Sequence, residues 1–183
     1  MKFRLQLTRE ALNGRWARTS AAAILVFLLL LWLDRSLYAA TGAGIVALQQ
    51  AAAGTDVRFI LDRWQDQQDA SLAGFLVGLD FLFVPLYAAA LYYGAVVARE
   101  TFAPDFGLRR RFLDALTMVP LLAAAADIAE NLLELVMLRS GPSDALVSLA
   151  GTATAIKNAG IGLGLVLSLA AAVVLLFRRR KPR

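Results

Sequence analysis

The stretch AAAILVFLLLLWL, residues 21–33, decides the class of this protein. It carries no charge, and with its flanks it reaches the roughly 20 apolar residues that a helix needs to cross about 30 Å of hydrocarbon. Because a lone backbone segment in lipid must satisfy its own hydrogen bonds, each stretch of this kind is expected to be helical. Such stretches recur along the chain and predict four spans, at about 16–40, 72–98, 112–138 and 145–177.

These spans leave little chain for anything else, so we predict a single transmembrane domain over 1–183, an all-α integral membrane four-helix bundle. A basic leader precedes the first span, as in a secretory signal peptide. The leader extends to Ser20, which is long for that purpose, and Asp34-Arg35 follows the apolar run. We therefore expect an uncleaved helix rather than a signal peptide.

The composition is typical of a membrane protein and excludes several kinds of catalytic and metal site. Of the 183 residues 59% are hydrophobic and 18% charged, whereas soluble domains average about 45–50% and about 25%. The chain has neither Cys nor His. Disulfides, thiolate or imidazole metal ligands and the Ser-His-Asp triad are therefore excluded. Any chemistry must use carboxylates, Lys, Tyr, Ser, Thr or a bound hard cation.

Lysine and arginine are divided unequally between the two sides of the predicted bundle. The leader, the second loop and the tail carry five, four and five, whereas the opposite side carries four. Because cytoplasmic loops are enriched in these residues, we predict a bacterial inner-membrane protein with both termini in the cytoplasm. Anionic lipid headgroups are the expected partners of the basic groups, and nucleic acid is not expected. The three groups are Lys2, Arg4, Arg9, Arg15 and Arg18; Arg99, Arg109, Arg110 and Arg111; and Arg178, Arg179, Arg180, Lys181 and Arg183.

The first outer loop, residues 41–71, has room for structure of its own. The stretch GIVALQQAAAG from Gly44 predicts a short helix, and Thr55 is a candidate N-cap for a second. Four apolar residues of the second helix share one face. We expect this face to lie on the outer membrane surface or over the bundle mouth, with Trp64 at the lipid headgroups. The face consists of Val57, Ile60, Leu61 and Trp64.

The third span carries a face of polar side chains. Asp127, Glu130, Asn131 and Glu134 recur at i, i+3, i+4 and i+7, the spacing that places side chains on one side of a helix. A charge at the bilayer centre costs roughly 2.5–3.5 kcal/mol even on the mildest scale. We therefore expect this face to point into the bundle. Two positions are open for Glu134 and for Asp80: each lines a buried polar pocket or reaches the outer interface.

Two other spans bring charges to the same level. At about 1.5 Å per residue from the cytoplasmic helix ends, Asp80 and Glu130 lie about 27 Å deep and Lys157 about 30 Å. This level is in the outer half of the bilayer, and Asn158 is available there as a hydrogen-bonding partner. The sequence thus predicts a ligand- or ion-binding pocket lined from three helices.

The acids of this predicted pocket outnumber its single lysine. Full ionisation of all of them is unfavourable in a low dielectric, so protons or a cation are expected there. Carboxylates and amides suit a hard divalent cation such as Mg²⁺ or Ca²⁺. If a metal binds, Asp80, Asp127 and Glu130 are its candidate ligands, and no other cofactor is evident.

Small and rigid residues predict how the spans pack. Gly74 with Gly78, and Gly160 with Gly164, form GxxxG pairs that are typical of close helix crossings. Pro85 and Pro120 lie inside the second and third spans and predict a kink in each.

Several stretches together carry a resemblance: LQQAAAGTDVRFILDRW, LDFLFVPLYAAAL, ADIAENLLEL and Ile156-Lys157-Asn158. The chain resembles a set of uncharacterised four-helix bacterial membrane proteins over roughly Ile45 to Asn158. In these, an aspartate opens span two, D-x-x-E-N lies in span three and a lysine in span four. The resemblance implies the topology and the choice of pocket residues, and because these proteins have no known activity it implies no reaction.

Three functions remain open. The first is binding or transport of a small polar ligand, an ion or a lipid headgroup, with Lys157 anchoring an anionic group or neutralising Asp80 or Asp127. The second is a structural or partner subunit whose buried charges fix helix packing or oligomerisation. The third is an intramembrane enzyme that uses a carboxylate pair for acid–base chemistry. It ranks last because no nucleophile or phosphate motif accompanies the acids. If the chain oligomerises, we expect a homodimer.

Overall fold

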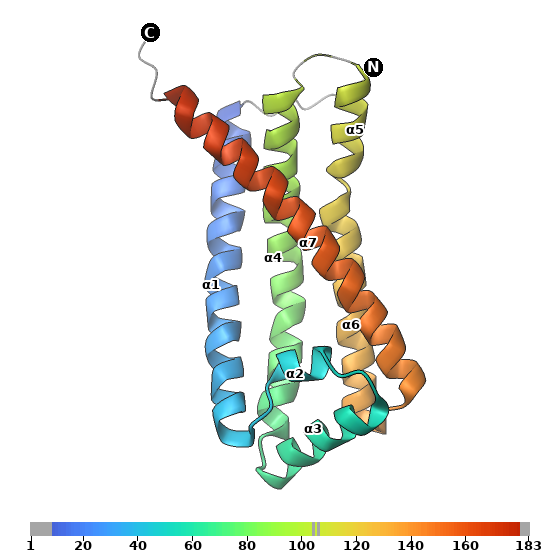
Figure 1. Ribbon diagram of the computed structural model, residues 1–183. Helices are drawn as coiled ribbons and strands as arrows, with labels where there is room; N and C mark the ends of the chain where they lie inside the picture. Colours follow the sequence, from blue (N-terminus) through green and yellow to red (C-terminus); the bar gives the residue numbers. More distant parts are fainter. Residues whose placement is uncertain (1–8, 104, 106, 180–183) are drawn as a thin grey trace, which may run out of the picture.

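The computed structural model describes residues 9–103, 105 and 107–179. All regular structure within these residues is helical, which confirms the all-α class. The helices, labelled in Figure 1, are α1 (Arg9–Thr41), α2 (Ile45–Gln49), α3 (Gly54–Asp66), α4 (Ala70–Phe102), α5 (Leu108–Leu116), α6 (Val119–Ser140) and α7 (Asp144–Arg179).

Four helical segments are long and apolar enough to cross a membrane, as predicted: α1, α4, α5 with α6, and α7. They lie beside one another as a bundle, with α4 packed against α1, α6 and α7 (Figure 1). The short helices α2 and α3 lie together at one end, which we call the covered end. The start of α1 and the end of α7 lie at the opposite end, which we call the terminal end (Figure 1).

The third span is divided, as its proline predicts. Helix α5 ends at Leu116 and α6 begins at Val119, with Pro120 in its first turn. Proline has no backbone N–H to donate and its ring excludes it from a helix interior, whereas the first turn tolerates it. The expected kink is therefore a break between two helices. The Thr117 hydroxyl donates to the Asp114 carbonyl at 2.7 Å on one side of that break.

Helix α3 is part of the core. Its predicted apolar face is buried, and Trp64 is 0% exposed, with its indole N–H donating to the Ala43 carbonyl at 2.7 Å. The expectation of Trp64 at the headgroups is therefore wrong, and the position over the bundle mouth is the one observed. The predicted cap is also wrong, because Ala53 rather than Thr55 is the N-cap. The Asp56 carboxylate instead accepts from the Ala53 N–H at 3.2 Å.

Two carboxylates fix the covering helices α2 and α3 to the bundle. Asp34 of α1 accepts from the Ile45 N–H at 2.5 Å, at the first turn of α2. Asp144 of α7 accepts from the Gly54 N–H at 2.8 Å, at the first turn of α3. Free N–H groups at a helix start need such acceptors. The loop thereby folds back over the bundle.

One predicted glycine pair marks a close crossing and the other does not. A Cβ on Gly160 would lie 2.7 Å from the Ala123 Cβ of α6, and one on Gly164 would lie 3.2 Å from Leu91 of α4. Those two glycines therefore allow α7 to approach its neighbours. Gly74 and Gly78 face open space within the chain, so the crossing predicted there is wrong for this fold.

Charged side chains at the terminal end form a closed set of ion pairs, which we call the terminal cluster. Arg99 pairs with Asp114 and with Glu100, each at 2.8 Å, and Arg110 pairs with Glu100 at 2.7 Å. Each acid thus has an arginine partner. Other basic residues of the predicted cytoplasmic side lie outside the described residues, namely Lys2, Arg4, Arg180, Lys181 and Arg183.

Candidate functional site

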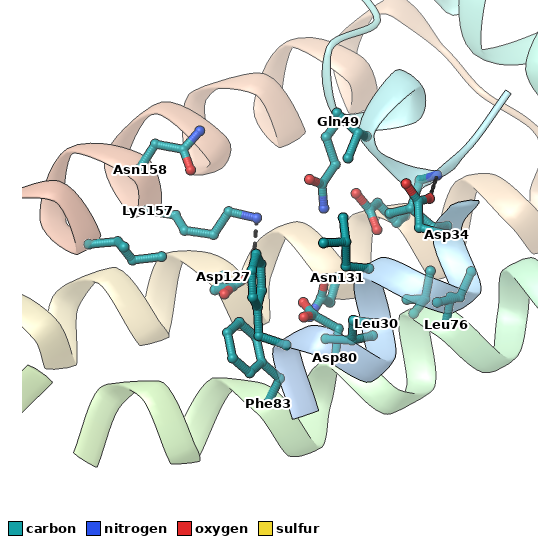
Figure 2. A pocket seen from close by; sticks show the side chains of 17 residues that line it. Leu30, Asp34, Gln49, Leu76, Asp80, Phe83, Asp127, Asn131, Lys157 and Asn158 are labelled. Atoms are coloured by element: carbon teal, nitrogen blue, oxygen red, sulfur yellow. Dashed lines mark hydrogen bonds and ion pairs between the residues drawn. The ribbon is translucent and has the colours of Figure 1, made fainter. Parts of the chain in front are cut away.

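The polar residues predicted from the sequence come from three neighbouring helices (Figure 2). Asp80 lies on α4, and Lys157 and Asn158 lie on α7. The predicted face of α6 is real: each of its four polar residues is at most 2% exposed. These four are Asp127, Glu130, Asn131 and Glu134.

Lys157 is held between two carboxylates of α6. Its Nζ lies 3.3 Å from Asp127 Oδ1 and also contacts Glu130 Oε2. The other Glu130 oxygen accepts from the Thr154 hydroxyl at 2.7 Å. Acids three residues apart on one helix face can flank a single ammonium. Lys157 therefore has a partner on each side and joins α7 to α6.

Asp80 is held by an amide rather than by the lysine. The Asn131 side-chain N–H donates to Asp80 Oδ2 at 2.8 Å and joins α6 to α4. Within the described residues, the ion pairs of Lys157 go to Asp127 and Glu130. From the sequence alone, Lys157 could neutralise either Asp80 or Asp127. In the structure Lys157 pairs with Asp127 and not with Asp80.

Glu134 takes the buried one of the two positions considered for it. It is 1% exposed, so it lies in the pocket and does not reach the outer interface. Helices α2 and α3 cover the end of the bundle, and Gln49 of α2 interacts with its carboxylate. Neither Glu134 oxygen meets the geometry of a hydrogen bond with any described residue. A buried acceptor without a partner is rare in proteins.

A cavity of about 250 Å³ joins these groups. Asp80, Asp127, Asn131, Glu134 and Lys157 line it together with apolar side chains of α1, α2, α4 and α7 (Figure 2). Asn158 also lines it but lies at its edge, with its side chain exposed and directed away from Asp127 (Figure 2). Glu130 lies behind Lys157 and is not part of the wall.

Three polar contributors were not predicted. Asp34 and Gln49 line the cavity from α1 and α2, and Thr154 binds Glu130 from α7. Asp34 follows the apolar run of the first span, where a charge is ordinary at a membrane surface. Gln49 belongs to a loop whose return over the bundle no periodicity reveals. Thr154 lies three residues before Lys157 on the same helix, and this i, i+3 spacing is the signal that would have found it.

The predicted divalent cation receives no support from this arrangement. Among the described residues, no group of three or more acidic side chains is placed to hold a metal ion. Two of the candidate ligands, Asp127 and Glu130, already flank Lys157, and the third, Asp80, binds Asn131.

Comparison of the chain with protein-family models, with curated proteins and with solved structures found no match. The resemblance to four-helix bacterial membrane proteins therefore gains no support from them.

Proposed function

We propose that this multi-pass membrane protein lies in the bacterial inner membrane and binds or transports a small polar ligand in the cavity beneath α2. Both termini are then cytoplasmic and α2 and α3 face outward. The distribution of arginine supports this orientation, because the terminal end carries most of the described arginines. Those at the terminal end are Arg9, Arg15, Arg18, Arg99, Arg109, Arg110, Arg111, Arg178 and Arg179.

The observation that carries the proposal is the Glu134 carboxylate. It is buried, it lines the cavity, and apart from its interaction with Gln49 neither of its oxygens has a hydrogen-bond partner in the described chain. Leaving a buried polar group unpaired costs about 1–3 kcal/mol, and more for a charged one. Side chains that serve only to hold helices together satisfy one another. An unsatisfied carboxylate facing a cavity is better explained by a ligand that satisfies it.

Native mass spectrometry of protein extracted in mild detergent tests this proposal. We expect a stoichiometric adduct on the wild type that Glu134→Gln lacks, because the variant removes the charge and keeps the shape. Asp62→Asn is the matched control, since Asp62 is an exposed acid of α3 outside the cavity wall. An adduct retained by Glu134→Gln, or a wild type without any adduct, would contradict the proposal.

A structural role is the second candidate, and a different observation favours it. The Lys157 ion pairs join α7 to α6, and the Asn131 to Asp80 hydrogen bond joins α6 to α4. These contacts fix the relative positions of three helices, as interhelical polar contacts do in membranes. Under this alternative Glu134→Gln leaves the bound mass unchanged, whereas loss of Lys157 separates an oligomer.

A further inference from the structure

The charges that a ligand can meet in this cavity are negative. Its wall carries Asp34, Asp80, Asp127 and Glu134 against Lys157. The lysine is already engaged by two carboxylates, so its ammonium is not available to an incoming anion. Asp34 is engaged by the Ile45 N–H and Asp127 by Lys157. Glu134 and Asp80, each with a single amide partner, remain for the ligand.

The rest of the wall is apolar and partly aromatic. Leu30, Leu76 and Val77 line the cavity beside the two acids, together with the rings of Phe27 and Phe83. The centroids of these rings are 5.9 Å apart. Aromatic faces attract cations, and most strongly where water is excluded. A metal ion such as Mg²⁺ retains several waters and requires oxygen ligands, which leucine, valine and phenylalanine walls do not supply.

The cavity opens sideways between α1 and α7. At the terminal end both helices reach α4, where Trp16 of α1 and Ser168 of α7 lie against Gly94. Towards the covered end α7 runs obliquely away to α6, while α1 stays along α4 (Figure 1). Three of the four exposed members of the wall lie at this gap, namely Phe27 and Leu31 on α1 and Asn158 on α7, and the fourth is Val46 on α2. A largely apolar mouth at the depth of the spans faces the bilayer interior.

From these features we infer that the cavity takes an organic cation with an apolar body, an alkyl or aryl ammonium, which reaches it from the membrane. This inference rests on the proposed function and names its ligand class. Glu134 and Asp80 neutralise the cationic head, and the leucine, valine and phenylalanine side chains enclose the body. The unpaired acid, the engaged lysine and the apolar mouth are all accounted for by this ligand class.

The test uses benzyltrimethylammonium as the probe, with benzenesulfonate and Mg²⁺ as the anionic and metal comparisons. Binding to the full chain in nanodiscs of neutral phosphatidylcholine is measured by isothermal titration calorimetry. We expect benzyltrimethylammonium to bind the wild type and Asp62→Asn with the same Kd. Glu134→Gln should raise that Kd at least about tenfold, which is 1.4 kcal/mol. Benzenesulfonate and Mg²⁺ should give no binding heat.

The results that overturn the inference are distinguishable from failure of the proposed function. An equal Kd for the wild type and Glu134→Gln, or no binding of benzyltrimethylammonium, overturns the cationic class. If benzenesulfonate or Mg²⁺ then binds and Glu134→Gln weakens it, the cavity is still a binding site and only the ligand class is wrong. If no probe binds and native mass spectrometry also finds no adduct, both fail.

Discussion

The terminal cluster and the cavity both bring opposite charges together, but they balance them differently. In the terminal cluster Arg99 and Arg110 face Glu100 and Asp114, and the side chains are 16–47% exposed. In the cavity, acids outnumber Lys157: Asp127, Glu134 and Lys157 are almost fully buried, and Asp34 and Asp80 are half-buried. The imbalance thus lies where an unpaired charge costs most. The charges of the terminal cluster balance one another, whereas the excess acid of the cavity is left for protons or, as proposed above, for a ligand.

The largest effect should come from breaking the ion pairs that Lys157 forms with Asp127 and Glu130. Lys157→Met leaves Asp127 and Glu130 without their cation. Removing one partner of a buried pair costs about 3–5 kcal/mol, so we expect a clear drop in thermal stability in nanodiscs. Adding Asp127→Asn and Glu130→Gln to Lys157→Met should recover much of the loss. If Lys157→Met alone melts at the same temperature as the wild type, these ion pairs do not contribute to stability.

Removal of the unpaired acid should act in the opposite direction. Glu134→Gln eliminates a buried carboxylate without a hydrogen bond, so the ligand-free protein should become more stable, by about 1–3 kcal/mol. The same variant should lose ligand. Thermal unfolding of delipidated, ligand-free samples measures this. A destabilised variant would mean that Glu134 has a stabilising partner, and the contrast between the two regions would disappear.

The covering helix α2 can be disturbed without changing any charge. A Cβ on Gly44 would lie 2.5 Å from Asp34 Oδ1, so Gly44→Ala should displace the carboxylate that caps α2. Loss of a helix cap costs about 1 kcal/mol. We expect faster hydrogen exchange at the Ile45 amide and weaker ligand binding. Gly74→Ala is the control, because that glycine faces open space. Equal hydrogen exchange at the Ile45 amide in both variants would show that Asp34 does not hold α2 in place.

The smallest effect is expected in the terminal cluster. Its arginine and carboxylate side chains are partly exposed, and such pairs contribute about 0.2–1 kcal/mol. Arg99→Ala should therefore lower stability slightly, less so at high salt, and leave ligand binding unchanged. Melting curves at low and high ionic strength measure this. A loss as large as that of Lys157→Met would contradict the distinction drawn between the two regions.

Much of the architecture was predictable because it depends on local pattern. Long apolar runs give the spans, and Pro120 gives the break between α5 and α6. The i, i+3, i+4, i+7 spacing gives the buried face of α6. Depth along each helix placed Asp80 and Lys157 at the level of that face. These inferences need only helix geometry and the cost of charge in lipid.

The features that could not be predicted depend on how the loop with α2 and α3 folds back over the bundle, and no local sequence pattern indicates this. Trp64 and Glu134 are buried because α2 and α3 close over the bundle, and Gln49 enters the cavity for the same reason. The ion-pair partners of Lys157 could not be predicted either, because depth in the membrane alone does not tell whether Lys157 pairs with Asp80 or with Glu130. Gly74 and Gly78 have the GxxxG spacing, but no other helix packs closely against them. The spacing alone therefore does not predict whether a second helix lies there.

The proposed role of Glu134 is to bind a cationic ligand. Its most direct test is the melting temperature of the wild type and of Glu134→Gln in neutral-lipid nanodiscs, each with and without benzyltrimethylammonium. A ligand that binds only the folded protein raises its stability. The account predicts that the probe stabilises the wild type and not Glu134→Gln, and that the variant melts higher when no probe is present. Equal stabilisation of both proteins, or of neither, would contradict it.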